Sequence, residues 1–225
     1  MTEFERKLRN LIERMTRENK PAGQVEAAVK RMLLQNPAER VFPDIRNLSV
    51  DDFVKQFGVS EVQQDAINSR LAPILKMAEK ASKNFKEDVL NAVQLGYKEA
   101  AKNGIEGDYR AVAREILRKA DSKLHHIETQ IVTASAALDR ASNVESERAA
   151  GVEWFRYVGP TGNARAFCAQ HAGRVYHISE ILAMDNGQGL SVLYNMGGWH
   201  CRHQWVGVSV EIARLERSDW FAKAA

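Results

Sequence analysis

The side chains best suited to chemistry are two cysteines and two histidines that form two close pairs. Cys168 and His171 make a C-x2-H pair, and Cys201 and His203 make a C-x-H pair. Such pairs of thiol and imidazole groups on distant segments are a common way to build a small zinc site. On a strand, Cys201 and His203 would share one face, whereas His200 would point away. The sequence therefore makes Cys168, His171, Cys201 and His203 the candidate ligands of a possible zinc site.

The same residues are also compatible with alternatives to a zinc site. The chain has only two cysteines, so Cys168 and Cys201 could form a disulfide, or both could be small buried residues beside satisfied histidines. Cys168 and His203 could also be the nucleophile and base of a thiol hydrolase, or the cluster could serve a metal-dependent nuclease. No flanking residues typical of a thiol enzyme are present, and no acidic residue adjoins His200 or His203. We therefore expect a protein that is not an enzyme.

The sequence also predicts the position of Arg202 and the backbone conformation of the glycines before Cys201. On a strand, Arg202 would face away from Cys201, as a surface arginine or as a buried one that binds backbone carbonyls or a carboxylate such as Glu180 or Asp185. The neighbouring pair Gly197-Gly198 predicts a backbone conformation that other residues cannot adopt.

The region that holds both pairs is predicted to be a small α+β module over residues 148–225. All four tryptophans lie at or beyond Trp154, and aromatic or β-branched runs favour short strands in "EWFRYV", "GRVYHI" and "HQWVGVSV". Ser179 is expected to cap a short helix between the last two of these strands. Trp220 and Phe221 fall on an expected C-terminal helix, as core residues or as a docking point.

Residues 1–147 are predicted to form a largely helical domain, which makes the whole chain an α+β protein. Apolar residues at helical spacing define two amphipathic helices before Pro37, either part of a bundle or an arm that docks on a partner. A connector is expected near 37–50, followed by a capping box at Ser49 and Asp52.

Breaks are expected within the later part of this helical domain. Pro73 should kink or split the helix that contains it, because proline lacks the backbone N–H. Asp108 is expected to cap the next helix after the turn "KNGIEGD", and Asp121 is expected to begin another.

Composition and charge narrow the class of protein. Hydrophobic residues make up 44% and charged residues 27% of the 225 residues, which is typical of a folded globular chain. The net charge of +3 is too weak to indicate or to exclude non-specific DNA binding. No run of about 18 apolar residues predicts a membrane span, and the charged start "MTEFERKLRN" does not resemble a secretory signal.

The order of motifs in the C-terminal region resembles the Mu F-like head-morphogenesis family of phage minor head proteins. In that family a segment "R-x-F-C … G-(K/R)-V" is followed by a closing "C-R-C" or "C-R-H" before a hydrophobic strand. The positions that match here are Arg165, Phe167, Cys168, Gly173, Arg174, Val175, Cys201, Arg202 and His203. The match covers about 60 residues, roughly a quarter of the chain.

This resemblance implies a virion protein of the phage head, made in the bacterial host cytoplasm. It implies association with the portal, with the major capsid protein or with both, and a role in head assembly. It further implies a possible action on packaged DNA or on DNA ejection. Many members carry a histidine three residues before the closing cysteine, where this chain has Gly198. A metal bound here would therefore need His171 as its remaining ligand.

Overall fold

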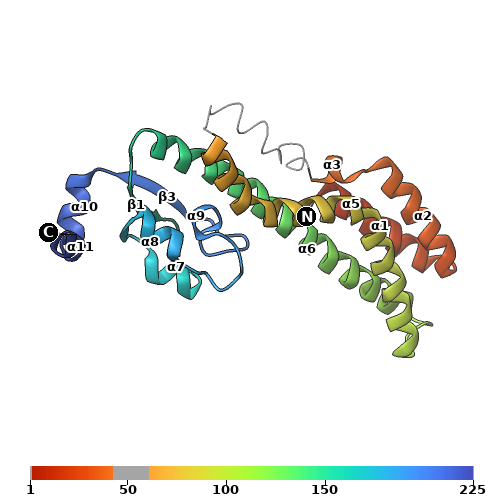
Figure 1. Cartoon of the computed structure of the whole chain (residues 1–225). Coiled ribbons are helices and arrows are strands. Elements are labelled where there is room, and N and C mark those ends of the chain that lie inside the picture. Colours follow the sequence, from red (N-terminus) through yellow and green to blue (C-terminus); the bar gives the residue numbers. More distant parts are fainter. Residues whose placement is uncertain (1, 43–60, 225) are drawn as a thin grey trace. The chain divides into compact units, whose positions relative to one another are not determined.

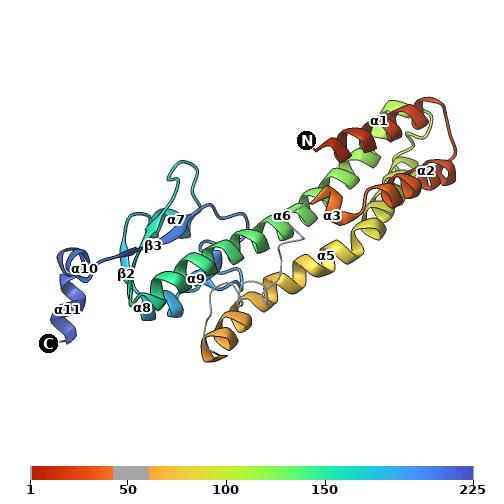
Figure 2. The ribbon, with the colours of Figure 1, turned by 90° about the horizontal axis from the view of Figure 1, so that it is seen from above.

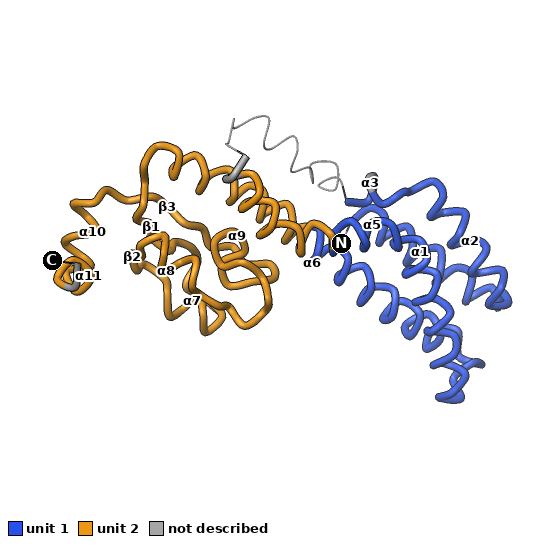
Figure 3. The backbone as a smooth tube through the Cα atoms, in the orientation of Figure 1, with its two compact units in different colours: residues 1–46, 77–131 blue, residues 47–76, 132–225 orange. Residues whose placement is uncertain are grey.

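A computed structural model describes residues 2–42 and 61–224 (Figure 1). The predicted capping box at Ser49 and most of the expected connector lie outside these residues. The chain divides into two compact units (Figure 3), unit 1 with residues Met1–Arg46 and Met77–Ile131, and unit 2 with residues Asn47–Lys76 and Val132–Ala225. This division falls within helix α5 (Glu61–Lys102) and within helix α6 (Tyr109–Ala149). The change in composition near residue 147 instead marks the end of α6.

Unit 1 begins with the two amphipathic helices that the sequence predicts. Helix α1 (Glu3–Arg17) starts with a capping box in which the Thr2 side chain accepts from the Glu5 N–H. Pro21 separates it from α2 (Ala22–Gln35), and the short helix α3 (Ala38–Val41) follows. Their apolar faces are buried, and the buried residues of α1 and α2 include Phe4, Leu8, Ile12, Val25, Val29 and Leu33.

Two long helices, α5 and α6, follow these three short ones among the described residues. Helix α5 (Glu61–Lys102) contains Pro73 without interruption, so the expected split there is wrong. Helix α6 (Tyr109–Ala149) is capped by Asp108, as predicted, because the Asp108 carboxylate accepts from the backbone N–H groups of the first turn. It continues through Asp121, where the prediction of a new helix is wrong. Among the described residues, no helix is both long enough and apolar enough to cross a membrane.

Unit 2 is built on one antiparallel sheet of three short strands, and the expected α+β class is confirmed. The central strand β1 (Trp154–Val158) pairs with β2 (Val175–His177) on one side and with β3 (Gln204–Val208) on the other. Phe155 lies opposite Tyr176 and Gly207 in these two pairings. All three strands lie where the alternation of residues predicts them.

Among the described residues of unit 2, five short helices lie between or after the strands: α7 (Ala166–His171), α8 (Ile178–Ala183), α9 (Val192–Asn195), α10 (Val210–Glu216) and α11 (Ser218–Ala224). The N-cap of α8 is His177 and not Ser179, because the chain leaves β2 directly into the helix. The sequence does not predict α7 and α9, since a helix of four to six residues is too short to show a helical period.

Candidate metal centre

Three of the four predicted ligands meet at one point in unit 2. Cys168 comes from α7, and Cys201 and His203 come from the segment directly before β3. The sulfur atoms of the two cysteines lie 3.7 Å apart, and Cys201 Sγ lies 3.5 Å from His203 Nδ1. All three side chains are buried, and their donor atoms lie within 4.8 Å of one another. These three residues, called the donor cluster below, could hold a metal ion.

The two cysteines are free thiols and not a disulfide. Their separation of 3.7 Å is far longer than the bond of about 2.05 Å between disulfide sulfurs. The open alternative of a disulfide is therefore not what this structure contains.

Burial alternates along the segment that enters β3. Cys201, His203 and Trp205 are buried, whereas Arg202 and Gln204 are exposed. The expectation that Cys201 and His203 share a face is thus met, although β3 itself begins only at Gln204. Arg202 is a surface arginine, and it also lines the cavity described below.

Tyr157 of β1 closes the donor cluster on a further side. Its hydroxyl donates to Cys168 Sγ at 3.3 Å and lies 3.9 Å from Cys201 Sγ. Its ring stacks on the His203 ring with centroids 4.9 Å apart. Tyr157 is completely buried, and the sequence pattern predicts it only as a strand residue, with no sign that it belongs to the site.

Burial sets the protonation states in the donor cluster. It raises the pKa of Cys168, against the smaller opposing effects of the Tyr157 hydrogen bond and the Arg165 charge. It also lowers the pKa of His203, whose Nε2 has no hydrogen-bond partner of good geometry, although the Pro160 carbonyl slightly favours the protonated ring. Without metal the cluster thus holds a neutral imidazole, which is the form that binds metal, and a Cys168 thiol, which must lose its proton.

Arg140 of α6 fixes the backbone around the donor cluster. Its guanidinium donates to the carbonyls of His203 (2.9 Å), Tyr194 (3.2 Å) and Cys201. The C-terminal half of α6 passes beside this loop in both views (Figures 1 and 2). The sequence suggests Arg202 for a buried arginine that binds carbonyls, but Arg140 has this role. The sequence around Cys201 and His203 gives no sign that Arg140, 61 and 63 positions earlier, binds their carbonyls.

Two glycines allow the close packing of the donor cluster. A Cβ atom at Gly197 would lie 2.3 Å from Cys168 Sγ and 3.5 Å from Cys201 Sγ. A Cβ atom at Gly159 would lie 2.5 Å from the His203 ring. Neither position has room for a larger residue, so the sulfur atoms and the imidazole approach the backbone directly.

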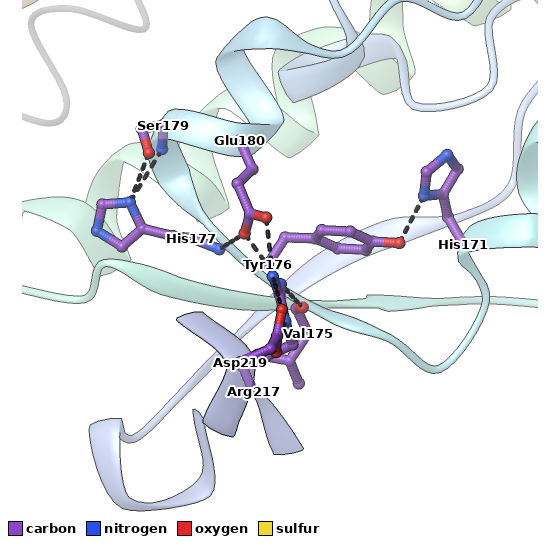
Figure 4. A network of polar contacts seen from close by, with 8 residues as sticks. All are labelled: His171, Val175, Tyr176, His177, Ser179, Glu180, Arg217 and Asp219. Carbon is purple, nitrogen blue, oxygen red and sulfur yellow. Dashed lines mark hydrogen bonds and ion pairs between the residues drawn. The ribbon is translucent and has the colours of Figure 1, made fainter. Parts of the chain in front are cut away.

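The fourth predicted ligand, His171, is not part of the donor cluster. Its Nδ1 forms a hydrogen bond of 2.7 Å with the Tyr176 hydroxyl, as Figure 4 shows. The same view shows Glu180 between Arg217 and the His177 backbone N–H, which Glu180 binds as an acceptor. Glu180 is therefore paired with Arg217 and not with Arg202, and the predicted contact of Arg202 with Glu180 is wrong.

The remaining motif residues support the loops around the donor cluster. Arg165 precedes α7 and donates to the Gly197 carbonyl at 3.3 Å, and the Phe167 ring packs against the Tyr157 ring. Gly173 and Arg174 pair with the Tyr157 backbone at the turn into β2, where Gly173 has a φ of 79°. Gly198 has a φ of 96°, which meets the expectation for one glycine of the Gly197-Gly198 pair.

A cavity of about 170 Å³ opens beside the donor cluster. Its wall combines all three donor residues with the loop before α7 and with two arginines; the lining residues are Pro160, Gly162, Asn163, Ala164, Arg165, Cys168, His200, Cys201, Arg202 and His203. No carboxylate belongs to this lining. His200, which the strand pattern predicts to point away from the metal, lines the cavity but does not join the cluster.

Comparison of the chain with protein-family models, with curated proteins and with solved structures gave no match. The features of the chain that bear on function are therefore the chemistry of the site and the order of the C-terminal motif residues.

Proposed function

We propose that the donor cluster binds one zinc ion. Tetrahedral zinc with Zn–S bonds of about 2.3 Å and Zn–N bonds of about 2.0–2.1 Å places two sulfur ligands about 3.8 Å apart, and a sulfur and a nitrogen about 3.6 Å apart. The corresponding separations in the donor cluster are 3.7 Å and 3.5 Å. This agreement is the observation that carries the proposal.

The chemistry and position of the donors favour a structural role for the ion. Two thiols and an imidazole suit zinc among the common divalent metals. A metal bound by Cys168 of α7 and by Cys201 and His203 before β3 would link two segments that are distant in sequence, which adds folding stability to that of the buried apolar side chains.

The biological role that best suits such a module is that of a minor head protein of a phage virion. The support is the ordered set of motif residues, whose first part around Cys168 contacts its closing part around Cys201. In this proposal the protein acts in head morphogenesis and binds the portal, the major capsid protein or both, with packaged DNA as a further contact.

Co-expression tests this role. The chain is expressed with the portal and major capsid proteins of the same phage, and we expect it to copurify with at least one of them. A Cys168→Ser, Cys201→Ser double variant shows whether the metal module is needed for that contact. Repeated failure of the wild-type chain to copurify with either protein would refute the role.

A metal-dependent nuclease or thiol hydrolase is the second candidate, because the cavity opens onto the donor cluster. Two observations argue against it: no carboxylate lines the cavity to hold Mg²⁺ or Mn²⁺, and burial raises the pKa of Cys168, which disfavours the nucleophilic thiolate. We expect no cleavage of duplex DNA with zinc, magnesium or manganese. Cleavage that disappears in a folded His203→Ala variant would establish the enzyme instead.

A further inference from the structure

The geometry points to an anion site in the cavity beside the donor cluster: a small oxyanion of phosphate type binds there and supplies the fourth ligand of the metal. This inference rests on the metal site proposed above. The donor cluster provides three protein ligands, and a zinc site that lacks a fourth protein ligand leaves one position for an external group.

Charge favours an anion in this cavity. Arg165 and Arg202 both line it, and no described carboxylate forms an ion pair with either guanidinium. Arg165 uses one N–H for the Gly197 carbonyl, so its other N–H groups remain available to a ligand. Arg202 is exposed and lines the same cavity. Two arginines that face one small space are a common arrangement for a phosphate group.

An unpartnered donor lies in the same wall. His203 is only 4% exposed, and its Nε2 is buried without a hydrogen bond of good geometry, although the Pro160 carbonyl lies close. A buried polar atom without a partner costs free energy unless a ligand or water satisfies it. With Nδ1 directed at the donor cluster, Nε2–H points to the opposite side of the ring, so its acceptor would be a water or second group in the cavity and not the metal-bound oxyanion itself.

Size selects the class of ligand. At about 170 Å³ the cavity is smaller than the roughly 300–1,000 Å³ of sites that enclose a whole small molecule. It suits a single phosphate group, free or at the end of a nucleic acid strand. A nucleotide base would have to remain outside.

Tyr157 is the competing fourth ligand. Its hydroxyl lies 3.3 Å and 3.9 Å from the two sulfur atoms, close to the separation of about 3.6 Å expected for a zinc-bound oxygen. The phenol, however, donates its proton to Cys168 and is completely buried, so the neutral form is favoured. A neutral phenol is a weaker ligand than a phosphate oxygen.

Cobalt substitution separates these two ligands, because the visible absorption of bound Co²⁺ reports its coordination. The full-length protein is loaded with Co²⁺, freed of unbound metal, and titrated with inorganic phosphate. We expect a saturable change in the visible bands that Tyr157→Phe leaves intact. Arg202→Ala and Arg165→Ala should each weaken the apparent phosphate affinity about tenfold, while Arg174→Ala, an exposed arginine outside the cavity, should not.

A second arm identifies the source of the anion. Short oligonucleotides with and without a 5′-phosphate are compared with inorganic phosphate. Tighter binding of the phosphorylated strand supports a nucleic acid end, and equal or weaker binding supports free phosphate.

Two results would overturn the inference. Cobalt bands that ignore phosphate but change in Tyr157→Phe would assign the fourth position to Tyr157 and leave the metal site standing. Failure of the folded wild-type chain to bind cobalt or zinc would remove the metal site and the anion site together.

Discussion

Gly197 is the residue that most tightly limits the space around the donor cluster. We expect Gly197→Ala to push the backbone away from Cys168 Sγ, which an alanine Cβ would approach to 2.3 Å. The variant should lose bound metal and about 1–3 kcal/mol of unfolding free energy. Metal analysis and thermal melting measure both effects.

Gly162 provides the matched control for this substitution. It lines the same cavity, but a Cβ atom there would meet nothing within 4 Å. Gly162→Ala should keep its metal and its melting temperature. If both variants behaved alike, the close contact between Gly197 and the sulfur atoms would be disproved.

His171 makes the stability of the protein depend on pH. Burial, together with the charge of Arg174, lowers the pKa of His171 below its usual value of 6.5. The folded state therefore binds this proton less readily than the unfolded state, and stability falls as the pH drops below about 6.5 toward the folded-state pKa. We expect His171→Gln to reduce the loss of melting temperature between about pH 7 and pH 5. A His171→Gln variant that loses as much melting temperature over this range as the wild type would contradict the assignment.

At the scale of elements, Arg140 joins helix α6 to the loop that carries Cys201 and His203. Arg140→Met removes three hydrogen bonds to buried carbonyls while keeping much of the side-chain volume. Because those carbonyls lose a charged donor, we expect a cost of about 3 kcal/mol or more in unfolding free energy. Chemical denaturation of the metal-free protein measures this cost without the contribution of the ion.

The neighbouring Arg202→Ala serves as the control, since that side chain is exposed. Its cost should stay within about 0.5 kcal/mol. An Arg140→Met variant as stable as Arg202→Ala would show that α6 does not hold this loop.

At the scale of the whole molecule, local patterns predict the elements better than they predict the contacts between them. The period of two in "HQWVGVSV" and the aromatic run at Trp154 are enough to place strands, and the C-x-H spacing is enough to put Cys201 and His203 on one face. The predicted split at Pro73 is wrong because a long helix tolerates one missing N–H when its other backbone hydrogen bonds persist.

The parts of the site that escape prediction depend on contacts that are distant in sequence. Arg140 lies on a helix whose pattern carries no sign of a metal loop, and Tyr157 looks like any aromatic strand residue. His171 has normal ligand spacing from Cys168, but its Nδ1 forms a hydrogen bond with the Tyr176 hydroxyl instead of joining the donor cluster. Spacing therefore identifies the donor types, and tertiary structure selects which of them meet.

Metal binding by Cys168, Cys201 and His203 is the property on which the proposed function depends. The most direct test is elemental analysis of the purified full-length chain beside a Cys201→Ser variant that is confirmed to be folded. We expect about one zinc ion per wild-type chain and little or none in the variant. A folded wild-type protein without bound metal, which takes up none when zinc is supplied under reducing conditions, would contradict it.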